Sequence, residues 1–498
     1  MSEQKHAEGY SHILKYTSLF GGIQGLGILI GVLRNKIVAV LLGPDGVGLQ
    51  TLFNATVKLM SDSTNLGVSM SGVREVSAAY EDTGDNAQNT LCYKICLIRS
   101  WSLLVAIAGT ILTILLSPLF NTSAFSWGNH IFHFLCLAPV VGLTAIIGGE
   151  LAVLKGLRRL RELAVASVYT VLASLILSTP LFCIWRESAI VPVMALATLA
   201  QIILVGRRSF RLFPYKVSLS KTILRDGMGM VRLGVAFVLA GVLGSGAEYI
   251  VRTWLGRVGG LEILGLYNAG YMMTMVYAGM VFSAMETDYF PRLSALKTLG
   301  PELNDKVNKQ IEVSLLLVSP MLVAFVIGMP LFLPLLYSGR FMPVLEMTQV
   351  AALAMYLRAM KLPVAYIPLA RGDSRSYLLM EGIYDVVMVV VVIAFYRFWG
   401  LFGTGLAMLV MAGFDLLMQI AYMRCRYGYI LSREVVAYAF IQLPIGITAY
   451  GVTCYLEGAA YWFFGACLFV ASAFVSLAVI RQKTRLWQRL KEKLNSSL

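Results

Sequence analysis

Charged side chains are scarce in this chain. Asp, Glu, Lys and Arg together make up 14% of its 498 residues, while hydrophobic residues make up 58%. A soluble protein usually carries about 25% charged residues, and the mean hydropathy is correspondingly high at +0.74. This composition excludes a soluble globular protein. It predicts an all-α integral membrane protein with no room for a large soluble domain.

The sequence also lacks the signatures of catalysis, metal binding and nucleotide hydrolysis. Its four histidines form no HExxH motif, and no GxxxxGK(S/T) loop occurs. The seven cysteines lie in or near apolar segments without a disulfide framework, so we interpret them as small core residues. The connectors predicted on the outer side are too short for the catalytic loop of a glycan polymerase or ligase. We therefore expect no enzyme activity, no cofactor and no metal.

Apolar segments of roughly 20 residues, the length of a membrane-spanning helix, follow one another along the chain. About fourteen such segments are separated by short connectors. The polar N-terminus lacks a small-residue cleavage site, so a cleaved signal peptide is not expected. The predicted spans are 10–42, 47–68, 91–116, 131–153, 163–184, 188–206, 231–252, 264–286, 311–336, 344–369, 376–398, 400–423, 434–455 and 458–480.

The net charge of +14 is distributed by side of the membrane. On this map the even-numbered connectors and both ends carry nearly all the Lys and Arg. The positive-inside rule then places both termini in the cytoplasm. The basic excess therefore indicates topology and contact with the inner leaflet, and no nucleic acid is expected as a partner. The arginines on the opposite side are Arg186, Arg252, Arg257, Arg340 and Arg397.

A weak internal repeat agrees with this topology. Residues 37–43 align with 250–256, and after a longer turn Gly48 aligns with Gly265. Six helices return the chain to the cytoplasm, so two six-helix halves would be parallel repeats, a common transporter plan. The expected domains are an N-terminal six-helix lobe at 1–215, a C-terminal six-helix lobe at 216–425, two additional helices at 426–480 and a basic cytoplasmic tail at 481–498.

The first predicted span carries charge at a depth where charge is costly. A charged side chain inside the bilayer normally faces protein or a water-filled cavity. Gln24, Gly27, Gly31 and Arg34 share one helical face. Arg34 on this face is expected to point into a cavity. The alternative is snorkelling, in which the side chain extends to the outer membrane interface, because the helical rise places Arg34 about 12 Å from the outer end of the helix. Lys36 lies on a different face and is the weaker candidate.

The second span carries a polar stripe of Asn54, Lys58, Ser61, Asp62 and Asn65. Lys58 and Asp62 stand at the i, i+4 spacing that permits an ion pair. A stripe of this length is difficult to explain as lipid-facing. Hydrogen bonding between packed helices is the structural alternative.

Further ionisable residues lie within the predicted spans of the second half. Glu248 and Arg252 stand four residues apart near the outer end of span seven. Any one of these residues could belong to a structural pair, but together they predict a bundle with a polar interior. The others are Glu286, Asp288, Arg358, Lys361, Glu381, Asp385 and Asp415.

Several segments in order resemble a known family. They read RNKIVAVLLGPDGVGLQ at 34–50, LKGLRRLRELA at 154–164, LGLYNAGYMM at 264–273, ETDYFPRLSAL at 286–296 and LYSGRFMPVLEM at 336–347. They are similar to the polysaccharide flippases, in the superfamily that also contains MATE multidrug carriers and the lipid II flippase. The group they resemble most is the O-antigen flippases of the Wzx type.

The resemblance implies two lobes facing a central cavity, lined by the first two helices of each lobe. It also implies a substrate with an undecaprenyl-pyrophosphate tail and an oligosaccharide head. The lipid II flippase has an arginine before its first-helix turn, and this correspondence carries over to Arg34. A second arginine of that flippase has no counterpart here, where Ile28 stands. The fourteen-helix count is also closer to the lipid II branch than to the commoner twelve helices of sugar flippases, which leaves the substrate subclass open.

The resulting hypothesis is a flippase for lipid-linked oligosaccharide in the bacterial inner membrane. Its partners would be the substrate, the lipid bilayer, a glycan polymerase and chain-length proteins, with H⁺ or Na⁺ as a coupling ion. An ion-coupled multidrug antiporter and a non-transporting scaffold of a glycan-assembly complex remain alternatives. The expected cavity residues are Arg34, Asn35, Lys58, Asp62, Glu248 and Arg252, and a second group of candidates for the cavity or for ion coupling is Lys36, Asn54, Arg358, Asp385 and Asp415.

Overall fold

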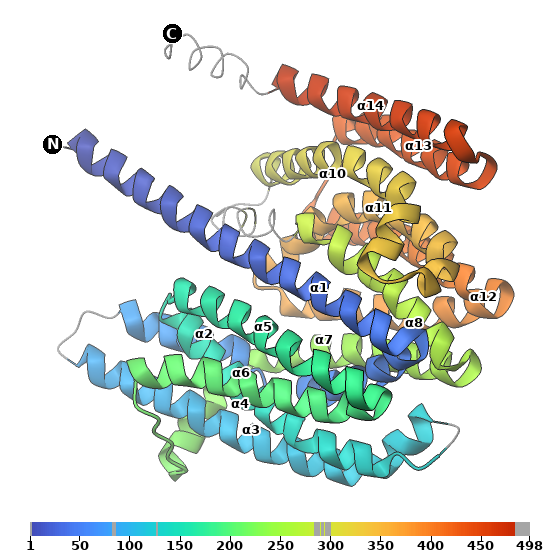
Figure 1. The fold of residues 1–498 in the computed structure, drawn as a ribbon. Helices are drawn as coiled ribbons and strands as arrows, with labels where there is room; N and C mark the ends of the chain where they lie inside the picture. Colours follow the sequence, from blue (N-terminus) through green and yellow to red (C-terminus); the bar gives the residue numbers. More distant parts are fainter. Residues whose placement is uncertain are drawn as a thin grey trace. The chain divides into compact units, whose positions relative to one another are not determined.

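A computed structural model describes residues 2–81, 86–125, 128–282, 289, 293 and 300–483, with only the backbone described at 2–25, 160 and 232–237. Every regular element in these residues is a helix (Figure 1). Glu286, Asp288 and residues 484–498 of the basic tail lie outside the described residues. The helices are α1 Ser2–Thr64, α2 Val68–Glu81, α3 Ala87–Ala124, α4 Ile131–Gly156, α5 Leu160–Trp185, η1 Arg186–Ala189, α6 Ile190–Leu212, α7 Lys221–Val258, α8 Gly260–Tyr271, the π-helical η2 Met272–Ala278, α10 Pro301–Leu336, η3 Gly339–Val344, α11 Leu345–Ala370, α12 Ser374–Tyr427, α13 Arg433–Tyr455 and α14 Gly458–Lys483.

Two of the long helices are interrupted by a glycine. Gly43 in α1 has φ 69° and ψ −172°, and Gly400 in α12 has φ 57° and ψ −141°. Only glycine adopts such angles without strain, so each helix consists of two segments that meet at a kink at one residue. These breaks fall at the predicted boundaries near residues 43 and 400. By length and composition, nine helices among the described residues could cross a membrane, and the count of fourteen stays a prediction.

The chain forms two compact units. Unit 1 is Met1–Gly265 with Leu336–Ser338, and unit 2 is Leu266–Leu335 with Gly339–Leu498. The division falls within α8, so α7 packs with the helices that precede it. The boundary between the two six-helix lobes at residue 215 rests on the sequence repeat, and it stays a prediction.

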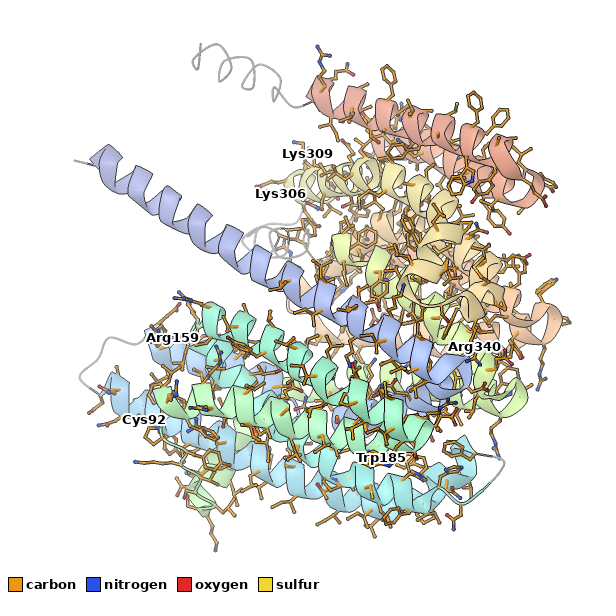
Figure 2. The ribbon with its side chains drawn as sticks, viewed as in Figure 1. Cys92, Arg159, Trp185, Lys306, Lys309 and Arg340 are labelled. Carbon is orange, nitrogen blue, oxygen red and sulfur yellow. The ribbon has the colours of Figure 1, made fainter. Side chains whose placement is uncertain are left out.

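In unit 1, α3 packs against α4, α1 against α5 and α7, and α4 against α6. The short α2 packs on α3, α4 and α7 of this bundle with one face. Its buried residues, among them Val68, Gly72 and Val76, recur at helical spacing. In Figure 2, Arg159 and Trp185 mark opposite ends of the unit 1 helices.

A buried ion pair joins three parts of unit 1. Arg99 of α3 donates from Nε and Nη2 to the two carboxylate oxygens of Glu150 in α4, at 2.9 and 3.1 Å, and both side chains are 1% exposed. Its Nη1 donates to the carbonyls of Phe213 and Pro214 at 3.2 and 2.8 Å. Arg99 therefore fixes the connector after α6 to the bundle, and removing one partner of such a pair typically costs about 3–5 kcal/mol.

The backbones of α1 and α8 approach each other in a reciprocal way. A Cβ on Gly48 would lie 2.0 Å from the carbonyl oxygen of Leu261, and one on Gly265 would lie 1.9 Å from that of Pro44. Gly48 and Gly265 are the glycines that the sequence repeat aligns, and Pro44 precedes Gly48 by the same interval as Leu261 precedes Gly265. The contact is therefore symmetric, and it depends on the absence of a side chain at both positions.

In unit 2, α11 packs against α12, and carbonyls of α10 accept hydrogen bonds from two tyrosine hydroxyls. The Tyr356 hydroxyl of α11 donates to the Ser319 carbonyl at 3.2 Å, and the Tyr461 hydroxyl of α14 donates to the Ile327 carbonyl at 2.7 Å. Gly465 lets α14 approach the Ile327 side chain closely. The additional helix α14 is thus packed on α10 within unit 2 through a hydroxyl and a glycine contact.

Asp373 caps α12 in the connector after α11. Its carboxylate accepts from Ser376 N at 3.1 Å, from Ser376 Oγ at 2.7 Å and from the Tyr427 hydroxyl at 2.7 Å. These hydrogen bonds stabilise the charged form and lower the pKa of Asp373 to about 2.

Replacing Gly48 by alanine should destabilise the protein by about 1–3 kcal/mol, because the added Cβ meets backbone that has no room to move. The matched control is Gly241→Ala in α7, where nothing lies within 4 Å of an added Cβ. That change should stabilise the helix by about 0.5–1 kcal/mol. Thermal unfolding of the purified protein measures both, and equal melting temperatures for the two variants would contradict the close approach.

Acid should remove the stabilisation contributed by Asp373. Its pKa in the folded chain, about 2, lies below the ordinary value of 3.8, so the contribution is complete above about pH 4 and is lost as the pH falls through 2. The melting temperature of the natural protein should therefore fall more steeply over this range than that of Asp373→Asn. Parallel curves would show that the cap does not stabilise α12.

Candidate functional site

A group of charged side chains lies between α1 and α7 in unit 1. Lys58 Nζ is 3.0 Å from Glu248 Oε2, and Arg252 Nη1 is 3.1 Å from the same oxygen. Asp62 lies against Ser245 and within the electrostatic field of Lys58 and Glu248. We refer to Lys58, Asp62, Ser245, Glu248 and Arg252 as the α1–α7 charge cluster.

Helical spacing brings these residues together. Lys58 and Asp62 are one turn apart on the second segment of α1, after the break at Gly43. On α7, Ser245, Glu248 and Arg252 follow at intervals of three and four residues, which places them on one face. Gly246 lets α7 lie close to Leu59 of α1, with 3.9 Å between that side chain and an added Cβ.

The charge cluster is formally neutral, with two cations and two carboxylates. Lys58 and Arg252 both contact Oε2 of Glu248, so the two cations share one carboxylate oxygen. The Lys58 side chain is 50% exposed, that of Glu248 23% and that of Arg252 12%. An incoming anion could therefore reach the Lys58 ammonium and replace Glu248 as its partner.

The structure corrects one expected contact. Lys58 pairs with Glu248 of α7, 190 residues away, and not with Asp62 on its own helix. Glu248 and Arg252, which stand four residues apart in the sequence, form an i, i+4 ion pair in the structure. Asn54, from the same polar stripe, is exposed on α1, and Asn65 donates to Ser69 at 2.7 Å.

Arg34 lies on the first segment of α1. Added Cβ atoms on Gly27 and Gly31 would contact Val168 and Val171 of α5 at 3.5 and 4.0 Å, so a neighbouring helix occupies the small-residue face. The Nε of Arg34 is buried and has no hydrogen-bond partner among the described residues. No described contact joins Arg34 to the charge cluster. Its neighbours Asn35 and Lys36 are half-buried and interact with other groups.

Unit 2 contains a separate polar group between α11 and α12. Lys361 Nζ is 2.8 Å from Asp415 Oδ2, and Lys361 also lies over the Tyr384 ring at 5.9 Å. Arg358 donates from Nη1 to the Met275 carbonyl at 3.3 Å. Asp385 is buried on α12. The predicted candidates Arg358, Asp385 and Asp415 thus all belong to unit 2, and the charge cluster belongs to unit 1.

The sequence reasoning missed Ser245 and the pairing of Lys361. Serine is common in membrane helices, so only its position three residues before Glu248 could have indicated a role for Ser245. Lys361 had been noted, but its partner Asp415 lies on another helix and carries no sequence signal. Among the described residues, no three His, Cys, Asp or Glu side chains gather as metal ligands.

A double-mutant cycle tests the observed pairing. Lys58→Ala and Glu248→Ala should be coupled by about 0.2–1 kcal/mol in thermal unfolding, since Lys58 is half exposed. The control cycle combines Lys58→Ala with Asp62→Ala, for which the coupling should be smaller. A larger coupling to Asp62 would show that the lysine pairs along its own helix.

Comparison with known proteins identifies the family. The family described as "Polysaccharide biosynthesis protein" matches residues 13–297. The chain matches no curated protein. The fold is similar to that of an inward-facing multidrug resistance MATE family transporter of the MOP superfamily, with a TM-score of 0.63 and 14% identity over 80% of this chain and 94% of that one.

Two further solved structures share the fold. The lipid II flippase MurJ in its inward closed conformation has a TM-score of 0.63 and 13% identity, covering 93% of this chain and 99% of its own. A MOP superfamily transporter from Pyrococcus furiosus, described as having a binding pocket of reverse polarity, has a TM-score of 0.58 and 14% identity over 81% and 93%. The chain therefore belongs to the family of polysaccharide biosynthesis proteins, and it is a multi-pass membrane protein with the fold of the MOP superfamily.

Proposed function

We propose that this protein is a flippase that moves undecaprenyl-pyrophosphate-linked oligosaccharide across the bacterial inner membrane by alternating access. Both termini would lie in the cytoplasm, and the repeat unit of an O-antigen, capsule or exopolysaccharide would be the cargo. The observation that carries the proposal is the buried Arg34 Nε, which has no partner among the described residues, in a member of the polysaccharide biosynthesis family.

The chemistry of the substrate explains why such a cation is useful. Hydroxyl groups and phosphate charges lose their water on entering hydrocarbon, and leaving them unsatisfied costs several kcal/mol each. A guanidinium binds phosphate oxygens through two parallel N–H donors, which makes arginine well suited to a pyrophosphate. Arg34 on the first membrane helix would replace water for this group while the polyprenyl chain stays in the bilayer.

The α1–α7 charge cluster supports a second contact. Lys58 is half exposed, and it shares the Glu248 oxygen with Arg252. A phosphate or an acidic sugar would compete with Glu248 for Lys58, and Arg252 would keep Glu248 neutralised. Exchange of this kind would let the site bind an anion and then release it, because Lys58 and Glu248 each keep a partner of opposite charge in both states.

The strongest competing function is an ion-coupled multidrug antiporter, which the likeness to MATE transporters favours. In that case the acidic residues would act, including Asp415 with its Lys361 partner in unit 2, and the basic residues would be structural. A non-transporting scaffold of a glycan-assembly complex is the other alternative. A coupling ion, H⁺ or Na⁺, is compatible with the flippase and with the antiporter.

Replacing Arg34 by alanine should abolish export of the surface glycan while the amount of protein in the membrane stays normal. The matched control is Arg257→Ala, because Arg257 is exposed at the end of α7 and should leave export unchanged. Glycan on intact cells, measured against protein level by immunoblot, gives the result. Normal export by Arg34→Ala would overturn the site.

Reconstituted vesicles separate the functions themselves. The purified protein should move fluorescent polyprenyl-pyrophosphate oligosaccharide between leaflets, with Lys58→Ala slower than the natural protein. Movement of a cationic dye against an ion gradient, without movement of the lipid, would instead identify an antiporter. No movement of either substrate would leave the scaffold as the explanation.

A further inference from the structure

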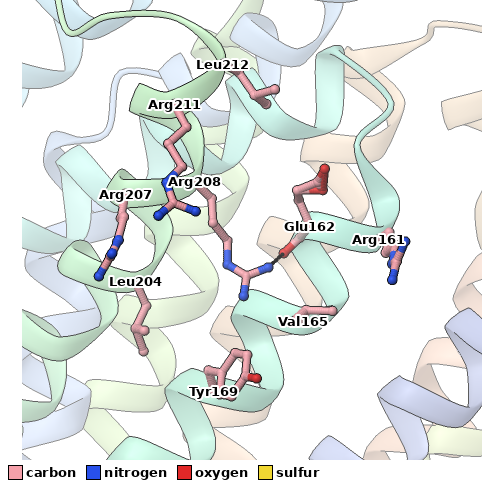
Figure 3. A pocket seen from close by; sticks show the side chains of 9 residues that line it. All are labelled: Arg161, Glu162, Val165, Tyr169, Leu204, Arg207, Arg208, Arg211 and Leu212. Atoms are coloured by element: carbon pink, nitrogen blue, oxygen red, sulfur yellow. Dashed lines mark hydrogen bonds between the residues drawn. The ribbon is translucent and has the colours of Figure 1, made fainter.

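A basic groove lies between α5 and α6 of unit 1. It has a volume of about 730 Å³ and is lined by arginines from both helices, together with Glu162, Tyr169 and apolar side chains. Arg161 comes from α5, and Arg207, Arg208 and Arg211 come from α6 (Figure 3). The sequence attributes the basic excess on this side to topology and to contact with the inner leaflet, without indicating a groove.

Most of this positive charge is not neutralised by the protein. Within the described part of the chain, Arg161, Arg207 and Arg211 form no ion pair or hydrogen bond from their side chains. Arg208 donates from Nη1 to the Glu162 carbonyl at 3.4 Å, and its guanidinium lies 5.5 Å from the centre of the Tyr169 ring. One guanidinium is thus held in position in the groove, while three others surround it with unused donors.

The groove continues into an apolar surface. Along α5, Tyr169 and Ile176 are separated by two helical turns and are 48% and 62% exposed. Along α6, Leu199 and Ile203 precede Arg207 at intervals of four residues and are 42% and 63% exposed. Charged donors at the helix ends therefore adjoin an exposed apolar strip that runs toward the middle of the same helices.

This arrangement matches an amphiphile with an anionic head. Soluble phosphate or a nucleic acid needs the arginines but has no use for the apolar strip, whereas a phospholipid uses both. Basic pockets between membrane helices on the cytoplasmic side suit anionic head groups, and arginine binds the phosphate diester through its planar set of donors. The groove arginines lie in the first turn of α5 and the last two turns of α6. Arg159, just before α5, lies at the opposite end of these helices from Trp185 (Figure 2), and the charge distribution assigns the Arg159 end to the cytoplasm.

We propose that the α5–α6 groove binds the phosphate head group of an anionic phospholipid of the surrounding bilayer, with the acyl chains lying along Tyr169, Ile176 and Ile203. The ligand is a resident lipid and not the transported one. The site is formed within unit 1 by residues other than Arg34 and the charge cluster, so it does not depend on the proposed transport function.

The test compares the double variant Arg207→Gln and Arg211→Gln with the double control Lys216→Gln and Lys221→Gln. Both double variants lose two positive charges, and Lys216 and Lys221 are exposed between α6 and the start of α7, outside the lining of the groove. The full-length proteins are purified from vesicles of phosphatidylcholine with and without phosphatidylglycerol, and the retained lipid is identified by native mass spectrometry. Removing two basic contacts should weaken phosphatidylglycerol binding about 30-fold, and the control should bind like the natural protein.

Several results would overturn the site. Equal losses of phosphatidylglycerol binding in both double variants would mean that binding depends only on the net charge of the protein. Displacement of the retained lipid by water-soluble inorganic pyrophosphate would show that the acyl chains contribute nothing. Retention of a polyprenyl pyrophosphate with no retention of phosphatidylglycerol would assign the groove to the transported lipid. Melting curves of both double variants check that each is folded, so a loss confined to the groove variant supports the proposal.

Discussion

A charge placed in hydrocarbon must be solvated by the protein itself, because no water is present to do so. This constraint organises both units. Arg99 is satisfied by Glu150 and by two backbone carbonyls, Lys361 by Asp415, and Lys58 and Arg252 by one oxygen of Glu248. The Arg252–Glu248 pair lies within α7, but the other pairs connect different helices, so satisfying these charges also links the elements that pack together. Arg34 departs from this pattern, since its buried Nε has no partner among the described residues.

Exposure separates the roles of these pairs. The Arg99 and Glu150 side chains are both 1% exposed, and all three nitrogens of the Arg99 guanidinium donate hydrogen bonds. Such an arrangement suits a permanent connection between helices α3 and α4 and the segment after α6. Lys58 is half exposed and shares its acceptor, so a ligand can reach it at low cost. The same residue types therefore serve structure at one position and, under the proposed function, would exchange a ligand at another, because desolvation makes the first arrangement costly to open.

Glycine sets the backbone geometry around these charges. The left-handed dihedral of Gly43 lets one long helix contain two segments, with Arg34 before the break and Lys58 after it. The reciprocal approach of Gly48 and Gly265 brings the backbones of α1 and α8 closer than any side chain would allow. The arginines of the α5–α6 groove are different from these paired charges. They extend from the helix ends into an open groove, where bilayer lipid or solvent can accept the hydrogen bonds that the protein does not.

Much of the fold could be predicted from the sequence, because hydropathy and helix punctuation are local properties. The apolar segments, the break at Gly43 and the i, i+4 pair of Glu248 and Arg252 all follow from neighbouring residues. The aligned glycines at 48 and 265 indicated the repeat, although only the structure showed that they touch. Tertiary packing alone decided that Lys58 pairs with Glu248 across 190 residues rather than with Asp62, that Lys361 meets Asp415, and that four arginines form a groove. Side chains find partners in space, and local spacing specifies only which faces are available to meet.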